Sequence, residues 1–354
     1  MLLIPVLLLA GLGLVFVYSA SSHMALHRLG DGYFYLKRQT LFCIPGFAVL
    51  FAARHIPCRL YGKLVYPLLL ASLALLVLLL IPGFGHRVGA ACRWFRVAGF
   101  SFQPAELAKF SLAVYMAYSM AKKGSHMETF SKGLVPHLVV AGLFMGLIVF
   151  QPDLGTAVIL GCWILIVLFV GGVKPLQVAL VGALSMPLLL WLIWQAPYRM
   201  KRWGAFMNPW EDPNGMGFQI IHSYLAFGSG GLFGAGLGNS KQKLFYLPES
   251  HTDFILSIAG EELGFAGVAC VVILFGMVIT RGLQISLRAK DLYSSYLAFG
   301  LTCLLALQVL INMGVVLGLL PTKGLTLPLI SYGGSSLLIT LWSMGVLLNI
   351  AAER

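Results

Sequence analysis

The amino-acid sequence predicts an all-α integral membrane protein of about ten transmembrane helices with one large extracytoplasmic loop. Of its 354 residues, 59% are hydrophobic and only 10% are charged, whereas roughly a quarter are charged in an ordinary soluble domain. The apolar residues gather into runs of about 20, the length that crosses a bilayer as a helix. Because lipid offers the backbone no hydrogen-bond partners, these runs are expected to be helical.

The apolar runs can be followed in order along the chain. We place spans at residues 2–20, 38–53, 64–82, 104–120, 135–150, 154–171, 174–195, 253–280, 292–318 and 325–351. The connections are short, except that residues 196–252 are too polar and glycine-rich to span and too long for a simple turn. We therefore expect one polytopic membrane domain over residues 1–354, with its large loop between helices 7 and 8.

The distribution of basic residues predicts the orientation. If the N-terminus is cytoplasmic, the short inner loops hold eleven Lys and Arg residues and the short outer loops hold seven. Cytoplasmic loops carry the excess, so both termini are expected inside and the large loop outside. In a membrane protein the net charge of +12 mainly reports this orientation and does not indicate nucleic-acid binding. The cations that remain outside would be explained by an anionic outer ligand.

Asp253 is the first candidate functional residue, because an ionisable group at a membrane helix end is costly to bury. It opens the eighth span, and Lys241, Lys243, Glu249 and His251 closely precede it. Helix capping by Thr252 or Asp253 is the simpler interpretation. The charged neighbours favour a functional one.

The start of the fourth span carries a second charged group. Pro104 suits a helix start, and Glu106 and Lys109 lie three residues apart on one helical face. The pair is either an internal ion pair that neutralises two costly charges or part of a cavity lining. In the preceding loop, Arg93 and Arg96 flank Trp94 and Phe95, which suits a membrane interface with guanidinium groups available to phosphate.

Three other segments have structural interpretations that compete with functional ones. Asp153, in a tight outer turn, is expected mainly to cap the sixth helix. The Ser331 to Ser336 run interrupts the last apolar segment and permits irregular backbone or close helix packing, of which packing is favoured. Within the large loop, residues 208–213 are turn-rich, residues 218–227 suit a short interfacial helix, and six glycines at 228–238 suggest a mobile cover. The glycines at 234–238 only weakly suggest a phosphate-binding nest.

Five segments together resemble the SEDS family (shape, elongation, division and sporulation), over essentially the whole chain. They are residues 103–109, 151–156, 248–254, 260–264 and 331–336. Residues 208–210, 238–243 and 320–326 are most similar to the cell-division branch, with the elongation branch as the near alternative. The resemblance implies a peptidoglycan glycosyltransferase that polymerises lipid II at the outer face of the bacterial cytoplasmic membrane, at the division septum.

The resemblance also implies roles for particular residues. The essential carboxylate falls on Asp253, which we expect to act as general base in an inverting reaction, and the cations are expected to stabilise the pyrophosphate leaving group. The candidate substrate-binding residues are Arg93, Glu106, Lys109, Asp153, Lys241, Lys243, His251, Ser331 and Ser335. A divalent cation, Mg²⁺ or Mn²⁺, is expected to share the charge, its protein ligands unidentified, and no organic cofactor is expected. The expected partners are a class B penicillin-binding protein (a transpeptidase) and other divisome proteins.

Two other classes of function compete with polymerisation. A lipid II flippase would also need many helices, a cavity and cations, but transporters tend to bind at the bilayer midplane between inverted repeats. No repeat is evident here, and the ionisable residues gather at outer helix ends, which favours surface chemistry. A scaffold that only recruits a synthase would leave the buried charges unexplained.

Overall fold

The structure, a computed structural model, describes residues 2–88, 91–97, 100–244, 247–248 and 250–353 of the chain. The chain forms two compact units. The first unit comprises residues 1–43, 185–278 and 308–333, and the second comprises residues 44–184, 279–307 and 334–354. The boundary between the units falls inside long helices, and the expectation of one membrane domain stays a prediction.

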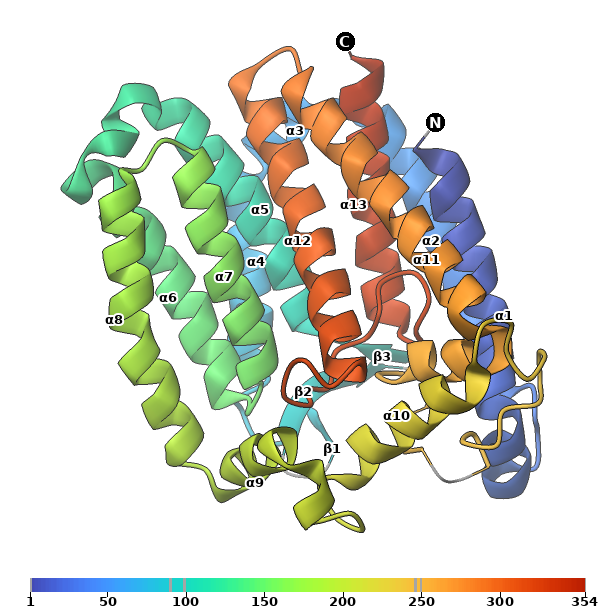
Figure 1. Cartoon of the computed structure of the whole chain (residues 1–354). Helices are drawn as coiled ribbons and strands as arrows, with labels where there is room; N and C mark the ends of the chain where they lie inside the picture. The colour runs from blue at the N-terminus through green and yellow to red at the C-terminus, as the bar shows by residue number, and fades with distance from the viewer. Residues whose placement is uncertain (1, 89–90, 98–99, 245–246, 249, 354) are drawn as a thin grey trace. The chain divides into compact units, whose positions relative to one another are not determined.

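The first unit contains long helices and the large loop (Figure 1). Its elements are α1 (Leu3–Leu29), the first part of α2 (Phe34–His55), the end of α8 (Pro175–Trp194), α9 (Pro197–Met207), η3 (Pro209–Glu211), α10 (Phe218–Gly230), most of α11 (Ile255–Leu287) and the end of α12 (Leu292–Val316). The short helix predicted at residues 218–227 is α10. The loop also contains α9, which the sequence did not lead us to expect.

The second unit combines helices with a small sheet. Its elements are the end of α2, α3 (Cys58–Lys63), α4 (Val65–Leu78), β1 (His86–Val88), β2 (Ala91–Val97), β3 (Phe100–Phe102), α5 (Pro104–Lys123), η1 (Gly124–Glu128), η2 (Phe130–Leu134), α6 (Val135–Phe150), α7 (Leu154–Val170), the first part of α8, the end of α11, the first part of α12 and α13 (Gly334–Ala352).

Each predicted span overlaps a helix, which confirms the all-α membrane class. Among the described residues, seven helices are long and apolar enough to cross a membrane, and α4 and α7 are shorter apolar helices. The number of spans stays a prediction. One boundary differs clearly, because the span predicted from residue 325 becomes helical only at Gly334. The residues before it have turn and irregular backbone, the alternative that was less favoured than close helix packing for the Gly and Ser run.

Helix α5 is the centre of the second unit. It packs against α3, α4, α6, α7 and α13, and most of its residues are buried. A helix surrounded by other helices does not need a lipid-compatible surface, so it can carry polar side chains that a lipid-facing helix would expose at high cost. This position explains how α5 carries Glu106 and Lys109.

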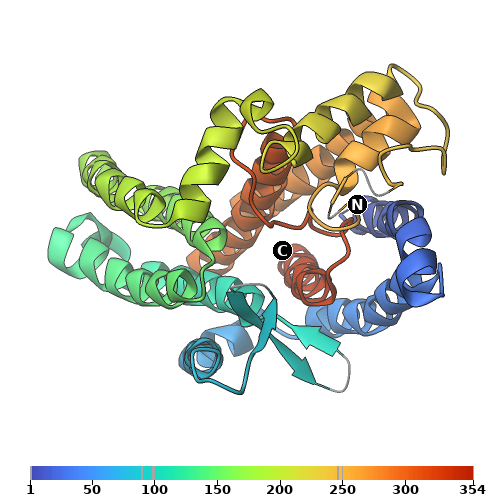
Figure 2. The same cartoon turned by 90° about the horizontal axis from the view of Figure 1, so that it is seen from below.

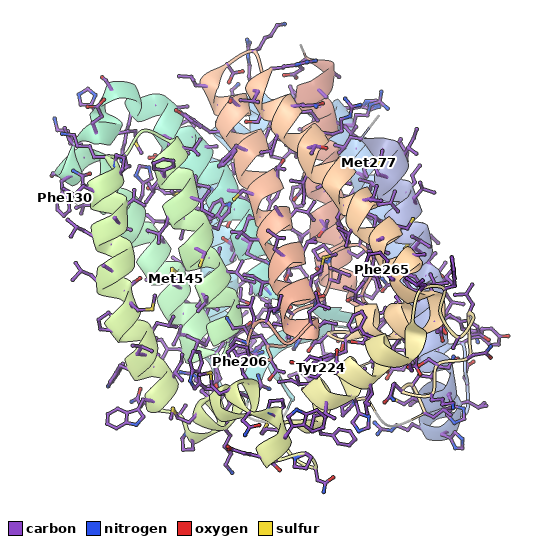
Figure 3. All side chains as sticks on the ribbon, in the orientation of Figure 1. Phe130, Met145, Phe206, Tyr224, Phe265 and Met277 are labelled. Atoms are coloured by element: carbon purple, nitrogen blue, oxygen red, sulfur yellow. The ribbon has the colours of Figure 1, made fainter. Side chains whose placement is uncertain are left out.

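Many apolar side chains lie on outer faces, as expected where lipid replaces water. Phe130 is 60% exposed and Phe265 69% exposed, and Figure 3 labels both among the side chains. Helix α8 buries none of its residues, and its Leu184 and Trp194 are each 75% exposed. Such surfaces would drive aggregation of a soluble protein. In a membrane protein they are the lipid-facing surface.

Residues 86–102 include a three-stranded antiparallel sheet, in a stretch that was expected only as a loop. The strands lie in the order β1-β2-β3 (Figure 2), with Arg96 paired to Ser101. Successive side chains of a strand point to opposite faces, so Arg93 and Arg96, three positions apart on β2, point to opposite faces. The sheet therefore separates two arginines that are near neighbours in the sequence.

Helix α11 is interrupted at Gly264, and the glycine-rich segment of the large loop fills the interruption. In a regular helix the Phe265 N–H would donate to the Glu261 carbonyl and the Ala266 N–H to the Glu262 carbonyl. Here these N–H groups donate to the carbonyls of Gly231 (2.9 Å) and Leu232 (3.0 Å). Gly264 has φ 66° and ψ −165°, a conformation essentially restricted to glycine.

The two carbonyls that the interruption releases also find partners. They accept hydrogen bonds from the N–H groups of Ala235 (2.9 Å) and Gly236 (3.0 Å). Helix α10, yellow in Figures 1 and 2, lies beside the first turns of α11. Because the N–H groups of Ala235 and Gly236 donate to these carbonyls, they are not available to a phosphate. This weakens the interpretation of residues 234–238 as a phosphate-binding nest. The mobility of this cover stays a prediction.

Candidate functional site

Asp253 lies in the turn that leads into α11. The helix begins at Ile255, two residues after Asp253, and capping by Thr252 or Asp253 stays a prediction. The Asp253 side chain is half-buried. A Cβ atom added to the exposed Gly324 would lie 3.4 Å from Asp253 Oδ2. The carboxylate therefore borders the segment that links α12 to α13, on a side that solvent reaches.

Ser331 ties the turn before α11 to this linking segment. Its hydroxyl donates to the Thr252 carbonyl (2.5 Å) and accepts from the Leu327 N–H (2.8 Å). The next N–H, that of Tyr332, donates to the His251 carbonyl (3.0 Å). Ser331 thus holds the backbone on which Asp253 sits. Direct contact of Ser331 with substrate stays a prediction.

His251 lies in an aromatic cluster beside this turn. Its buried ring is 4.5 Å from the Tyr35 ring and 5.8 Å from the Tyr332 ring, centre to centre. Arg38 on α2 lies near the Tyr332 side chain, and Gln39 donates to the Ser331 carbonyl (3.2 Å). The start of α2 therefore also supports the backbone of the linking segment, at Ser331.

The Lys243 side chain is buried in the first unit, where its ammonium has several protein partners. Its Nζ lies 2.9 Å from Glu262 Oε1, and the two side chains are 8% and 0% exposed. The ammonium also donates to Ser19 Oγ (3.2 Å) and to the Gly238 carbonyl (2.6 Å). Since three protein groups already accept from it, Lys243 holds the large loop against α1 and α11. Its contact with substrate stays a prediction.

The neighbouring Glu261 is held differently. Its carboxylate accepts from the Lys241 N–H (2.9 Å), the Gln242 N–H (3.2 Å) and the Ser240 hydroxyl. The Lys241 side chain is exposed. Of the two loop lysines predicted to bind substrate, Lys241 and Lys243, Lys241 is thus the exposed one. Glu249 lies outside the described residues.

In the second unit, Glu106 and Lys109 form the predicted pair. Lys109 Nζ is 2.7 Å from Glu106 Oε1, and both residues are buried. Ser335, on α13, contacts the segment that leads into α5: its hydroxyl accepts from the Gln103 N–H (3.0 Å) and donates to the Ser101 carbonyl (3.1 Å). Gln103 is the N-cap residue of α5. Ser335 therefore fixes the start of the helix that carries the charged pair.

Arg93 and Asp153 meet at the turn between α6 and α7. Asp153 caps α7 by accepting from the Thr156 N–H (3.2 Å) and hydroxyl (2.9 Å), as the structural interpretation predicted. Arg93 donates to the carbonyls of Gln151 (3.2 Å) and Pro152, and its Nη1 lies 3.9 Å from Asp153 Oδ1. The guanidinium is thus engaged with the turn, and binding of phosphate by Arg93 stays a prediction.

The structure offers no protein cage for a divalent cation in the part of the chain that it describes. Groups of three or more His, Cys, Asp or Glu side chains that could hold a metal are absent there. In phosphate-handling sites Mg²⁺ is often held by one or two carboxylates together with substrate phosphates. The expected cation therefore stays a proposal, and we assign it no protein ligands.

The whole chain, residues 1–354, matches the family described as cell cycle proteins, which groups FtsW, RodA and SpoVE. This chain belongs to that family. The match confirms the resemblance found in the five segments.

Relatives from several bacteria are similar over nearly their full length. A probable peptidoglycan glycosyltransferase FtsW from Geobacter sulfurreducens is 48% identical over 341 residues, covering 96% of this chain and 91% of the relative. Stage V sporulation protein E from Bacillus subtilis is 43% identical, covering 99% and 96%.

Solved structures of this family share the fold. The rod shape determining protein RodA from Thermus thermophilus has a TM-score of 0.73 and 30% identity, covering 100% of this chain and 96% of that one. A chain from a peptidoglycan synthase complex, studied for its coordination of polymerisation and crosslinking, has a TM-score of 0.80 and 30% identity, covering 100% and 97%.

Several residues around Asp253 were not among the predicted site residues. Asn312 on α12 and Gln39 on α2 are 1% exposed; Asn312 donates to the Asp253 carbonyl and Gln39 to the Ser331 carbonyl. Tyr35 and Arg38 belong to the same surroundings. The sequence signal that could have found these residues is a polar side chain within an apolar run. Asn312 and Gln39 fit it, but sequence distance hid the contacts of Asn312 with Asp253 and of Gln39 with Ser331.

Proposed function

We propose that this membrane glycosyltransferase polymerises lipid II into glycan strands at the outer face of the cytoplasmic membrane, with Asp253 as general base. In this reaction the 4-hydroxyl oxygen of an acceptor sugar forms a bond with the anomeric carbon of the donor. The bond from that carbon to the lipid pyrophosphate breaks, and the hydroxyl proton passes to Asp253. Direct displacement inverts the anomeric carbon.

The observation that carries this proposal is the environment of Asp253. Asp253 is half-buried beside an exposed glycine, while Ser331 and Tyr332 of the linking segment donate to the carbonyls of the two preceding residues, Thr252 and His251. A general base contributes typically 10²–10⁴-fold when it is well positioned. A fixed backbone with an accessible carboxylate meets that requirement.

The outer-face cations are proposed to stabilise charge on the departing pyrophosphate, because preorganised electrostatic stabilisation usually contributes most to the rate enhancement of an enzyme. Lys241 is exposed and is the simplest candidate in the first unit. Lys109 and Arg93 remain candidates in the second unit, although each already has protein partners. Lys243 is the least accessible candidate in the first unit.

We assign the chain to septal synthesis in cell division, in partnership with a class B penicillin-binding protein. A relative named FtsW is 48% identical, whereas the RodA structure is 30% identical, which supports the division branch. The similarity to a chain of a peptidoglycan synthase complex supports a crosslinking partner. A fluorescent fusion of the chain should gather at mid-cell. A uniform distribution along the cell wall would favour the elongation branch.

The test of the catalytic proposal is polymerisation of lipid II by the purified protein, with and without its partner synthase. Wild type is expected to make long glycan strands, and Asp253→Asn is expected to make at least 10²-fold less product, because the amide cannot accept the proton. The matched control is Asp31→Asn, which changes an exposed carboxylate that pairs with Lys37 and should leave the rate unchanged.

The same assay separates the rival functions. Retained polymerisation by Asp253→Asn would remove this residue from the mechanism. Absence of strands from folded wild-type protein, with any partner and with Mg²⁺ or Mn²⁺, would favour the flippase or the scaffold. Chelation of divalent cations is expected to lower the rate, and their return should restore it.

A further inference from the structure

Asn312 is a buried polar residue on α12 that contacts the backbone of Asp253. Its side-chain Nδ2 donates to the Asp253 carbonyl (3.1 Å) and to the Leu325 carbonyl (2.6 Å). Asn312 is 1% exposed. One amide nitrogen thus joins two chain segments that are far apart in sequence, the turn before α11 and the segment that links α12 to α13.

The orientation of this amide follows from its partners. Both neighbours are carbonyl oxygens, which only accept hydrogen bonds, so the group between them must be the NH₂. The opposite atom, Oδ1, is buried without a hydrogen-bond partner. A buried polar atom left unpaired costs free energy, and a leucine of similar size would avoid that cost. The two donated bonds are the compensating interaction that the structure shows.

The linking segment borders the reactive atoms as well as the backbone of Asp253. Gly324, next to Leu325, is the residue whose added Cβ would lie 3.4 Å from Asp253 Oδ2. Further along the segment, Ser331 and Tyr332 bond the backbone of residues 251–252. The linking segment is therefore held at two points. Asn312 holds it at Leu325, and Ser331 holds it at the turn before α11.

We propose that Asn312 is a positioning residue that sets the location of the Asp253 carboxylate by clamping the Asp253 and Leu325 backbones together. The proposal rests on the assignment of Asp253 as the base. Asn312 is buried and donates to backbone carbonyls, so it would act on the reaction through Asp253. Loss of the clamp is expected to misplace the base by a fraction of an ångström to an ångström, and misplacements of this size can cost about 10²-fold in rate.

The test compares Asn312→Leu with Thr302→Val. Both positions are on α12 and 1% exposed, but the Thr302 hydroxyl donates only to the Ala298 carbonyl of its own helix (2.7 Å). Asn312→Leu is expected to lower kcat about 10- to 100-fold with KM changed less than twofold, while Thr302→Val keeps the wild-type kcat. Detergent-solubilised samples of both variants should melt as single species.

Hydrogen–deuterium exchange supplies a readout that does not depend on catalysis. In Asn312→Leu, the amides of residues 325–332 are expected to exchange at least about tenfold faster, with α1 unchanged, because the linking segment has lost its anchor. If Asn312→Leu does not fold, Asn312→Ser replaces it, since the shorter hydroxyl cannot reach both carbonyls.

The results of these experiments distinguish a failure of the Asn312 proposal from a failure of the Asp253 assignment. Wild-type exchange at residues 325–332, or wild-type kcat, in a folded Asn312 variant would overturn the clamp whatever the reaction proves to be. Wild-type kcat in Asp253→Asn would instead overturn the base assignment, and the exchange measurement would still decide whether Asn312 anchors the segment.

Discussion

Two buried carboxylates among the described residues pair with lysine side chains at short range. Glu262 has Lys243 at 2.9 Å and Glu106 has Lys109 at 2.7 Å, each pair largely shielded from solvent. The exposed pair Lys37 and Asp31, at 2.8 Å, has the same geometry but side chains that are 68% and 38% exposed. Breaking a buried pair therefore costs much of the free energy of unfolding, whereas an exposed pair contributes little to it.

Removing one partner of the buried pair in the first unit is expected to be strongly destabilising. Lys243→Met leaves Glu262 buried without its cation and should cost on the order of 3–5 kcal/mol. The double variant Lys243→Met with Glu262→Gln should recover much of this loss. Thermal melting in detergent measures the effect, and Lys37→Met, which breaks the exposed pair, is the matched control, expected within about 1 kcal/mol. Equal melting of Lys243→Met and wild type would contradict the structural role.

The pair on α5 allows stability and catalysis to be separated. The double variant Glu106→Gln with Lys109→Met removes both charges at once, so it should melt within a few degrees of wild type. If Lys109 stabilises the departing pyrophosphate, polymerisation should fall at least about tenfold in the same protein. An unchanged rate in this double variant would show that the pair only neutralises two buried charges.

At the scale of elements, the interruption of α11 couples a membrane helix to the large loop. Four backbone hydrogen bonds join residues 231–236 to residues 261–266, and the Glu261 and Glu262 side chains hold residues 240–243 from the same stretch of helix. Irregular backbone at a membrane helix is tolerated where protein groups satisfy it. The large loop thus completes the hydrogen bonding of α11.

Glycine at position 264 should be indispensable for this arrangement. Gly264→Ala would place a Cβ 2.4 Å from the Gly234 nitrogen in a conformation that costs a non-glycine residue about 1–3 kcal/mol before any clash. We expect a melting temperature at least several degrees lower and a loss of polymerisation. Gly276→Ala, on the same helix with open space around its added Cβ, should be neutral or slightly stabilising. Similar melting of the two variants would contradict the requirement for glycine.

At the scale of the whole molecule, the open prediction is the orientation in the membrane. Basic residues are more frequent in the short loops predicted to be inside, so a green fluorescent protein fused to the C-terminus should fluoresce and an alkaline phosphatase fused there should be inactive. A cysteine at the exposed position 201 of α9 should react with an impermeant maleimide added outside the cell. An active C-terminal phosphatase would reverse the predicted orientation.

The membrane class, the extent of most helices and the candidate charged residues followed from the sequence, because each depends on local composition and spacing. The apolar runs predicted helices close to α6, α7 and α8, and the spacing of Glu106 and Lys109 predicted their ion pair. The capping role of Asp153 followed from its place in a tight turn. These features involve residues only a few positions apart.

The partners of those residues were decided by tertiary structure. Arg93 reaches a turn 58 positions away, Asn312 reaches Asp253 across 59 positions, and Ser19 reaches Glu262 across 243. Periodicity does not encode contacts at such separations, because they depend on how helices pack. The interruption at Gly264 belongs to the same class, since the N–H groups of Phe265 and Ala266 donate to the carbonyls of Gly231 and Leu232 in the large loop.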